Sequence, residues 1–250
     1  MSLFSLFKTI NSKKPPTCTA VIVAAGLSQR CEGEDKLFYR INDRPVLAYT
    51  ISAFQSSEMI NDIIVVTHED KINLVGEMCL EFGFNKVSQV IVGGKTRSES
   101  VLYGIYAASK KARLIAIHDG ARPCVDVKTI KRTILKAAKY NAAAPAVSIT
   151  STIKKVENEA IAGTVDREGL FEIQTPQIFR AELIKAALTK AIKKEIPVTD
   201  DCMAVEKLGF IVHVVEGSRK NIKITDKTDL SIVEAILSKT VSKEEGSQCE

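Results

Sequence analysis

Two cations follow a run of apolar and small residues near the start of the chain. Residues 21–26 read VIVAAG, and Arg30 and Lys36 come shortly after them. The small residues that end this run let a ligand approach the backbone, because no large side chain stands in the way. Fixed cations beside such a turn suit a chain of phosphates. We therefore expect this loop to bind a nucleoside triphosphate. The alternative is an ordinary turn between a strand and a helix, with a surface arginine.

Two common nucleotide-binding patterns are missing from this loop. It lacks the GxxxxGK[ST] of a P-loop, and Gly26 alone does not make the GxGxxG of dinucleotide-binding proteins. The sequence therefore argues against an NAD-dependent dehydrogenase.

A second polar cluster, residues 118–123 (HDGARP), follows another apolar run. Asp119 could hold a ribose hydroxyl or a Mg²⁺-bound water, because hard cations take carboxylate oxygen. Arg122 could bind a substrate phosphate or brace the loop by pairing with an acid, and both readings stay open. We expect His118 to be a hydrogen-bonded structural residue. A phosphate nucleophile is already ionised near neutral pH and needs no general base.

A third cluster, residues 93–100 (GGKTRSES), places two glycines before a predicted helix. Exposed backbone at the glycines, together with the nearby hydroxyls, could read the edge of a nucleobase. The alternative is helix capping by Thr96 or Ser98, and the two readings are compatible.

The elements that must position these clusters follow one rhythm. From residue 17, short apolar strands alternate with amphipathic helices, which indicates a parallel sheet covered by helices on both faces. We predict a Rossmann-like three-layer α/β/α sandwich with a mostly parallel sheet. The expected strands are residues 19–25, 62–67, 87–92, 114–117, 143–149, 210–215 and 221–225. The expected helices are residues 45–55, 70–82, 97–109, 127–140, 181–194 and 228–237, with a further one starting at 199–201.

The three polar clusters should meet at one edge of this sheet. Loops 24–36, 93–100 and 118–123 each follow a predicted strand. Ligands of such sheets bind at the carboxyl ends of the strands, so we expect a single site there.

The rhythm breaks between residues 150 and 175. Residues 152–156 and 163–167 read as the polar strands of a protruding β-hairpin arm. A two-stranded arm is marginally stable alone and leaves its edges open. A second copy of the chain is its natural partner, so we expect a homodimer formed through an arm at about residues 148–171.

Composition limits the class of protein. The chain has 250 residues, 45% of them hydrophobic, which suits one α/β domain at residues 17–240. Its net charge of +5 suits a protein that binds anionic small molecules. The mild charge and the absence of Trp argue against a nucleic-acid binder. Six cysteines without a CxxC pair indicate a reducing cytoplasm and no zinc site.

The two ends of the chain read differently from the middle. The sequence contains no apolar run long enough for a membrane span. Residues 1–16 lack the features of a signal peptide, and we expect a flexible extension rather than a surface-binding helix. Residues 241–250 read as a polar tail.

A set of short motifs occurs in one order along the chain. They are AAGxxxR (24–30), Lys36, GGxxRxxSV (93–101), HDGARP (118–123), TVDRxGL (164–170), QTPQxF (174–179), TDD (199–201) and EGxxxNIKIT (216–225). This ordered set resembles the 2-C-methyl-D-erythritol 4-phosphate cytidylyltransferases of the non-mevalonate isoprenoid route, over about residues 17–240. The sequence departs from that family at Leu37, where Gln is common, and at Lys95, where an acid is often found.

The resemblance implies an activity and a set of roles. In that family CTP and a polyol phosphate react with Mg²⁺ to give a CDP-alcohol and pyrophosphate. Arg30 and Lys36 would stabilise charge on the triphosphate, while Arg167 and Lys223 would position methylerythritol phosphate. The family's arm exchanges between subunits, so Arg167 would act in the partner's site. The implied cytidine pocket consists of Ala24, Ala25, Gly26, Gly94 and Ser100. Asp119 would contact the ribose or the metal, and Thr152 and Arg122 would contact the substrate.

Two other functions remain open at this point. A ribitol-5-phosphate cytidylyltransferase resembles the chain almost as well outside the arm, although TVDRxGL together with Thr152 favours methylerythritol phosphate. A nucleotide-binding module without catalysis is the other alternative. The simultaneous presence of cations on several loops argues against it.

Overall fold

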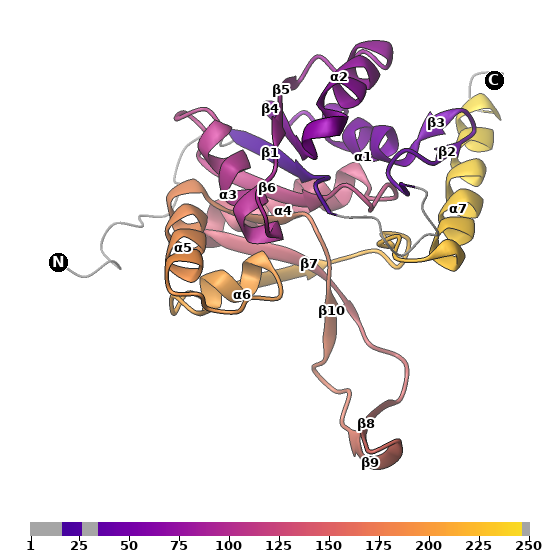
Figure 1. The fold of residues 1–250 in the computed structure, drawn as a ribbon. Helices are drawn as coiled ribbons and strands as arrows, with labels where there is room; N and C mark the ends of the chain where they lie inside the picture. The colour runs from indigo at the N-terminus through magenta and orange to yellow at the C-terminus, as the bar shows by residue number, and fades with distance from the viewer. Residues whose placement is uncertain (1–16, 27–34, 247–250) are drawn as a thin grey trace.

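A sheet of eight strands lies at the centre of the protein (Figure 1). The computed structural model describes residues 17–26 and 35–246, with residues 239–246 by backbone alone, and the sheet is counted over those residues. Its order is β10-β7-β11-β6-β1-β4-β5, and β12 pairs with β7. The strands are β1 (Cys18–Val23), β4 (Asp62–Thr67), β5 (Val87–Val92), β6 (Leu114–Asp119), β7 (Ala142–Ser148), β10 (Phe171–Ile173), β11 (Gln177–Arg180) and β12 (His213–Glu216).

Most of the sheet is parallel, as predicted. β1 pairs in parallel with β4 and β6, β4 with β5, and β12 with β7. The antiparallel strands β10 and β11 are the exceptions, and they were not predicted. In β11 the successive residues Ile178 and Phe179 are both buried, in two different hydrophobic clusters. A short strand that is buried on both faces shows no alternation of polar and apolar residues, so its sequence gives no period.

Helices cover both faces of the sheet, which confirms the three-layer sandwich. One face packs against α1 (Val46–Gln55), α2 (Ile72–Glu81), α4 (Val127–Tyr140) and α7 (Lys227–Gly246). The other face packs against α3 (Arg97–Ala107), α5 (Ala181–Lys193) and α6 (Asp201–Glu206). Strand β1 serves both cores, because Ala20 and Ile22 join the first cluster and Val21 joins the second.

Local chemistry sets the ends of the predicted helices. The Asp126 carboxylate accepts a hydrogen bond from the Thr129 amide at 2.6 Å, which caps the start of α4. The helix ends at Asn141, whose φ of 72° is the left-handed conformation common just beyond helix ends. Pro45 is the residue before α1 rather than its first residue.

The structure differs from the prediction in several places. A small hairpin of β2 (Arg40–Ile41) and β3 (Arg44–Pro45) precedes α1, and a 3₁₀ turn, η2 (Glu69–Lys71), precedes α2. Helix α7 continues past Leu237 to Gly246, and β12 starts only at His213. Residues 221–225, all of them described, form no strand, so that prediction was wrong.

The predicted arm projects from the body of the molecule (Figure 1). It consists of β8 (Ile153–Glu157) and β9 (Ala160–Val165), paired in antiparallel fashion. Asn158 and Glu159 join them with φ values of 48° and 65°, as a tight two-residue hairpin turn requires. The apolar side chains of Val156 and Ile161 lie exposed on the arm. Elsewhere, over the described residues, no helix combines the length and the apolar character needed to cross a bilayer.

Candidate active site

A cavity of about 630 Å³ opens at the carboxyl ends of β1, β4, β5 and β6. Each of the three predicted loops contributes to its wall, so the expectation that they meet is confirmed for the described residues. The predicted site residues that line it are Ala24, Ala25, Gly26, Lys36, Gly94, Ser100, Asp119 and Lys223.

Four other predicted site residues are placed differently. Arg30 lies outside the described residues. Thr152 and Arg167 lie on or beside the exposed arm, where an Arg167 Nη1 donates to the carbonyl of Thr150. Arg122 is buried and is absent from the described lining of the cavity. One copy of the chain therefore does not bring the arm residues to the cavity.

The loops after β1 and β5 approach each other closely at one end of the cavity. The Ala24 amide donates to the carbonyl of Val66 at 2.7 Å, and the Gly93 amide donates to that of Thr67 at 2.8 Å. A Cβ atom at Gly93 would lie 2.5 Å from the Cβ of Ala25. Only glycine fits at this position, and its backbone together with that of Gly94 is left as a surface that a flat ligand can reach.

Ser100 holds this glycine loop against helix α3. Its buried hydroxyl accepts a hydrogen bond from the Gly94 amide at 3.0 Å and donates to the Thr96 carbonyl at 3.0 Å. Thr96 is the N-cap of α3, in a capping box with Glu99. Of the two predicted caps, Thr96 is confirmed. The loop is thus both a cap and a wall of the cavity.

At the other end of the cavity, three cations surround the carboxylate of Asp119. Arg97 approaches Oδ1 through Nη2 at 3.2 Å, Lys223 approaches Oδ2 through Nζ at 3.0 Å, and Arg122 approaches Oδ2 through Nε at 3.6 Å. Burial raises the pKa of Asp119, but Arg97, Lys223 and Arg122 outweigh it and hold the pKa well below its usual range. Asp119 is therefore ionised at every pH at which the protein would work.

Arg97 also contacts a second acid, which sequence reasoning missed. Its Nη1 lies 2.9 Å from Oδ2 of Asp201, the first residue of α6, whose side chain is 1% exposed. Burial raises the pKa of Asp201. Burial alone would lower the pKa of Arg97, but the carboxylates of Asp201 and Asp119 outweigh it and hold that pKa above its ordinary value. A signal was present in the sequence. A cation in the first turn of a helix opposes the helix dipole, so it needs acidic partners.

Lys36 and Lys223 are brought together by an irregular segment before α7. Lys36 Nζ donates to the carbonyl of Ile224 at 2.8 Å, and the Ile224 amide donates to the carbonyl of Ala121 at 2.9 Å. The backbone groups of this segment are thus taken by side chains and by a loop rather than by a strand. This explains why the strand predicted at 221–225 does not form.

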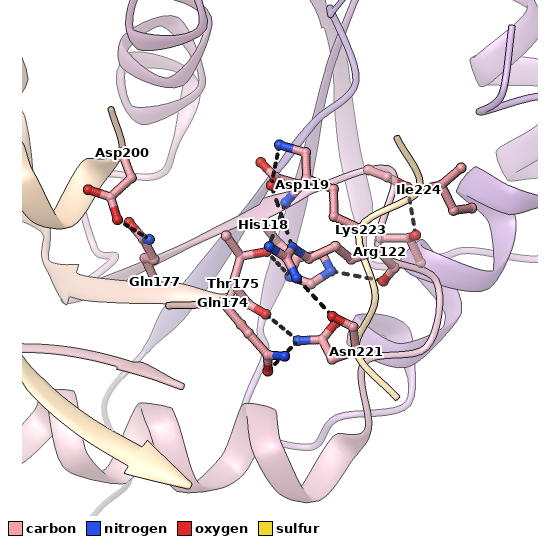
Figure 2. Close-up of polar contacts among 12 residues, drawn as sticks. His118, Asp119, Arg122, Gln174, Thr175, Gln177, Asp200, Asn221, Lys223 and Ile224 are labelled. Atoms are coloured by element: carbon pink, nitrogen blue, oxygen red, sulfur yellow. Dashed lines mark hydrogen bonds and ion pairs between the residues drawn. The ribbon is translucent and has the colours of Figure 1, made fainter. Parts of the chain in front are cut away.

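Buried side chains also fix the position of residues 218–224 by hydrogen bonds (Figure 2). Arg122 Nη1 donates to the carbonyl of Asn221 at 2.8 Å, and Asn221 Nδ2 donates to the carbonyl of Thr175 at 2.8 Å. The Gln174 amide Nε2 donates to the carbonyl of Ser218 at 2.9 Å. These contacts agree with the bracing role of Arg122, and its binding to a substrate phosphate stays a prediction. The QTPQ motif was noticed in the sequence, but its role in holding Lys223 was not.

His118 is fully buried and has a partner on each ring nitrogen. Nε2 lies 3.2 Å from the Arg122 carbonyl, which can only accept, so Nε2 carries the proton. Nδ1 then accepts from the Thr175 hydroxyl at 2.9 Å. Burial lowers the pKa of His118 to about 4, so the ring is neutral near pH 7. The expectation of a structural histidine agrees with these contacts.

The cavity could hold a Mg²⁺ ion only if oxygens of the substrate supplied most of its ligands. Among the described residues, no group of three or more acidic, His or Cys side chains could hold a metal. Asp119 supplies one hard carboxylate, and Mg²⁺ is commonly bound by one or two carboxylates together with substrate phosphates and water. Lys223 occupies Oδ2 of that carboxylate, so a metal there would take the place of the Lys223 ammonium.

Comparison with known proteins agrees with this geometry. The family model described as 2-C-methyl-D-erythritol 4-phosphate cytidylyltransferase matches residues 18–239. A protein of that name from Caldanaerobacter subterraneus is 44% identical over 224 residues, covering 88% of this chain and 99% of the relative. One from Halalkalibacterium halodurans is 40% identical over 220 residues, covering 88% of this chain and 96% of the relative.

Solved structures are similar over the same span. The 4-diphosphocytidyl-2C-methyl-D-erythritol synthase of Anaerococcus prevotii superposes with a TM-score of 0.79 at 28% identity, covering 90% of this chain and 97% of that one. The 2-C-methyl-D-erythritol 4-phosphate cytidylyltransferase of Thermus thermophilus gives 0.74 at 30% identity, covering 88% and 98%. With this family match and these identities over nearly all of its described length, the chain belongs to the 2-C-methyl-D-erythritol 4-phosphate cytidylyltransferase family.

Proposed function

We propose that this protein transfers the cytidylyl group of CTP to 2-C-methyl-D-erythritol 4-phosphate. The products are 4-CDP-2-C-methyl-D-erythritol and pyrophosphate, in the non-mevalonate route to isoprenoid precursors. Membership of the family gives the reaction class, a nucleotidyl transfer.

The division of the cavity into two ends is the observation that supports this proposal most. One end is backbone and small side chains around Ala25 and Gly94, which suits a flat base. The other end carries Lys36, Lys223 and the ionised Asp119, which suits phosphates and a ribose or a metal. A base, a sugar and a phosphate chain of one nucleotide can lie across such a cavity in that order.

The chemistry needs alignment and charge neutralisation more than proton transfer. An oxygen of the acceptor phosphate attacks the α-phosphorus of CTP, a new P–O bond forms, and the bond to the β-phosphate oxygen breaks to release pyrophosphate. Lys36, with Arg30, neutralises charge on the triphosphate, and Lys223 orients the acceptor phosphate. The acceptor phosphate is already ionised, so the buried neutral His118 has no proton to remove.

The proposal includes Mg²⁺ as the cofactor. Bound to the phosphate oxygens, the ion would neutralise charge that builds up on the leaving pyrophosphate. Oδ2 of Asp119 is the protein oxygen that we assign to it, or to the ribose. Arg97 would keep hold of Oδ1 in either case.

We further propose that the arm makes the protein a homodimer. The exposed apolar residues Val156 and Ile161 on the arm need a surface to cover them, and a second copy can provide it. Thr152 and Arg167 would then reach the acceptor in the partner's cavity. Residues 17–240 would form one domain with this dimerisation arm at about 148–171.

A cytoplasmic location is part of the same proposal. The free cysteines among the described residues, Cys18, Cys79, Cys124 and Cys202, support a reducing compartment.

The direct test is pyrophosphate release from CTP with each candidate acceptor in the presence of Mg²⁺. We expect turnover with methylerythritol phosphate and much less with ribitol 5-phosphate. Turnover only with ribitol 5-phosphate would overturn the choice of acceptor. CTP binding without product from either acceptor would indicate a module without catalysis.

The two lysines of the cavity give the matching mutational test. Lys36→Met and Lys223→Met keep most of the aliphatic stem and remove the charge. We expect each to lower kcat/KM by on the order of 100- to 1000-fold, similar to the removal of one charge-stabilising donor in other enzymes. Lys110→Met, at an exposed position after α3, is the control and should match the parent. Near-parental rates in both cavity variants would remove these lysines from the mechanism.

A further inference from the structure

We propose that Arg97 is a positioning residue for this reaction, which fixes Oδ1 of Asp119 and leaves Oδ2 as the oxygen that exchanges partners. This inference rests on the proposed function and deepens it. It assigns a role to a residue of the cavity wall that the motif GGxxRxxSV contains but for which the sequence analysis gave no role.

The geometry ties one guanidinium to two carboxylates on different elements. Nε and Nη2 of Arg97 lie 3.3 and 3.2 Å from Oδ1 of Asp119, at the end of β6. Nη1 lies 2.9 Å from Oδ2 of Asp201, at the start of α6. A planar group held at three nitrogens cannot rotate freely, so its hold on Oδ1 is directional.

Charge explains why an arginine occupies this position. Asp201 is fully buried, and its Oδ1 has no hydrogen-bond partner among the described residues. Within the described part of the chain, Arg97 is the cation within ion-pair distance of it. A buried carboxylate without a cation is strongly destabilising, so Asp201 keeps Arg97 in place and charged. Arg97 in turn stays directed at Asp119.

The two oxygens of Asp119 therefore have different partners. Oδ1 faces the anchored Arg97. Oδ2 faces Lys223 at 3.0 Å, whose side chain is 42% exposed and sits on a flexible stem, and lies further from Nε of the buried Arg122, at 3.6 Å. A ribose hydroxyl or a metal that binds Asp119 would replace Lys223 at Oδ2, while Arg97 keeps the carboxylate plane fixed. Lys223 would at the same moment be released towards the acceptor phosphate.

The experiment must separate this role from simple support of the fold. Arg97→Gln leaves the buried Asp201 without its cation, but this loss is common to both forms of position 119 and cancels in a double-mutant cycle. Arg97→Lys, which keeps a cation beside Asp201 and loses the planar fork, repeats the cycle if Arg97→Gln does not fold. Four proteins are compared, with Arg97 or Gln at position 97 and Asp119 or Asn at position 119. Circular dichroism and thermal melts check that each is folded.

We expect the two substitutions to be strongly non-additive. Arg97→Gln should lower kcat/KM by tenfold or more when Asp119 is present, and by less than about twofold when Asn is at position 119. CTP affinity by calorimetry gives the same cycle where turnover is too slow to measure. Arg132→Gln, in α4 and outside the described lining of the cavity, is the matched control and should act equally in both backgrounds.

Equal effects of Arg97→Gln in both backgrounds would overturn the inference, because Arg97 would then not act through Asp119. The parent protein separates this failure from that of the proposed function. Parental turnover of CTP with methylerythritol phosphate together with an additive cycle contradicts the role of Arg97 alone. Absence of parental turnover with any acceptor contradicts the proposed function itself.

Discussion

His118 shows how a residue beside an acidic residue of the cavity can have a purely structural role. It precedes Asp119 in β6, but both of its ring nitrogens are engaged, by the Arg122 carbonyl and the Thr175 hydroxyl. The same Thr175 hydroxyl accepts from the Asp119 amide at 3.2 Å. His118 thus supports the backbone of the site and takes no part in proton transfer.

The burial of His118 predicts how stability depends on pH. Its pKa is about 4 in the folded protein, against 6.5 when exposed, so only the unfolded chain takes up a proton between these values. The contribution of His118 is fully present above pH 6.5 and is lost as the pH falls towards 4. The loss should reach on the order of 3 kcal/mol of unfolding free energy at the low end.

Two measurements check this. The ring protons of His118 in the NMR spectrum should show no titration until the pH is near 4. Denaturant unfolding at pH 7 and pH 5 should show a smaller pH dependence for His118→Gln than for the parent. A ring of His118 that titrates near 6.5 would contradict the assigned contacts.

Part of the site could be predicted from residue types. The rest depends on contacts between residues that are far apart in the sequence, and it could not be predicted. Small residues and lysines beside strand ends, such as Gly94 and Lys36, carry their own signal, because few other roles suit them there. Arg97 acts through Asp119 and Asp201, which lie 22 and 104 positions away in the sequence. Asn221 acts through Thr175, 46 positions away. A single sequence does not reveal which distant residues will meet.

At the scale of elements, helix α3 places the wall of the cavity. Gly104 lets this helix pack directly onto the sheet, because a Cβ there would lie 2.4 Å from Cγ1 of Val21 and 3.1 Å from Cγ2 of Val66. The close approach fixes the first turn of α3, which carries Arg97 and Ser100. The helix could be predicted from its period, but its closeness to the sheet could not.

Gly104→Ala should therefore destabilise the protein although alanine is the better helix former. We expect a loss of about 1–3 kcal/mol, since the methyl group must push β1 and α3 apart. Gly76→Ala is the matched control, because Gly76 lies inside α2 with nothing within 4 Å of the added Cβ. That change should stabilise by about 0.5–1 kcal/mol. The melting temperatures of the two variants are compared with that of the parent. A shift of both in the same direction would contradict this account.

The regular elements were easier to predict than the irregular ones. Strand β4 is a continuous apolar run and helix α4 has a clear amphipathic period, and both were predicted with the bounds observed. The short strands β10 and β11 and the segment at 221–225 were missed or misread, because tertiary contacts decide their conformation. The irregular segment carries Lys223, so the least predictable backbone lies at the site.

For the whole molecule, the arm is the feature that a single chain leaves unexplained. It extends away from the sandwich (Figure 1), and Thr152 and Arg167, which flank its two strands, are absent from the described lining of the chain's own cavity. The shared site that we propose between two copies would account for both observations.

Mixed dimers test this sharing. Arg167→Ala and Lys36→Ala should each be inactive alone, but a mixed dimer has one cavity with both residues intact. Random exchange makes half of the dimers mixed, with one working cavity in two, so activity should recover to about a quarter of the parent. Native mass spectrometry can establish that mixed dimers are present. If they form and stay inactive, the shared site is excluded.

The internal partners of Lys36 and Lys223 also shape how the protein meets its substrates. Each lysine already donates to an oxygen of the protein, the Ile224 carbonyl or the Asp119 carboxylate. A phosphate that binds Lys223 would replace a carboxylate oxygen, and one that binds Lys36 would replace a neutral carbonyl oxygen. Binding would then be an exchange of partners in which the net gain is the difference between the two, so a bound substrate would also have a built-in competitor that favours its release.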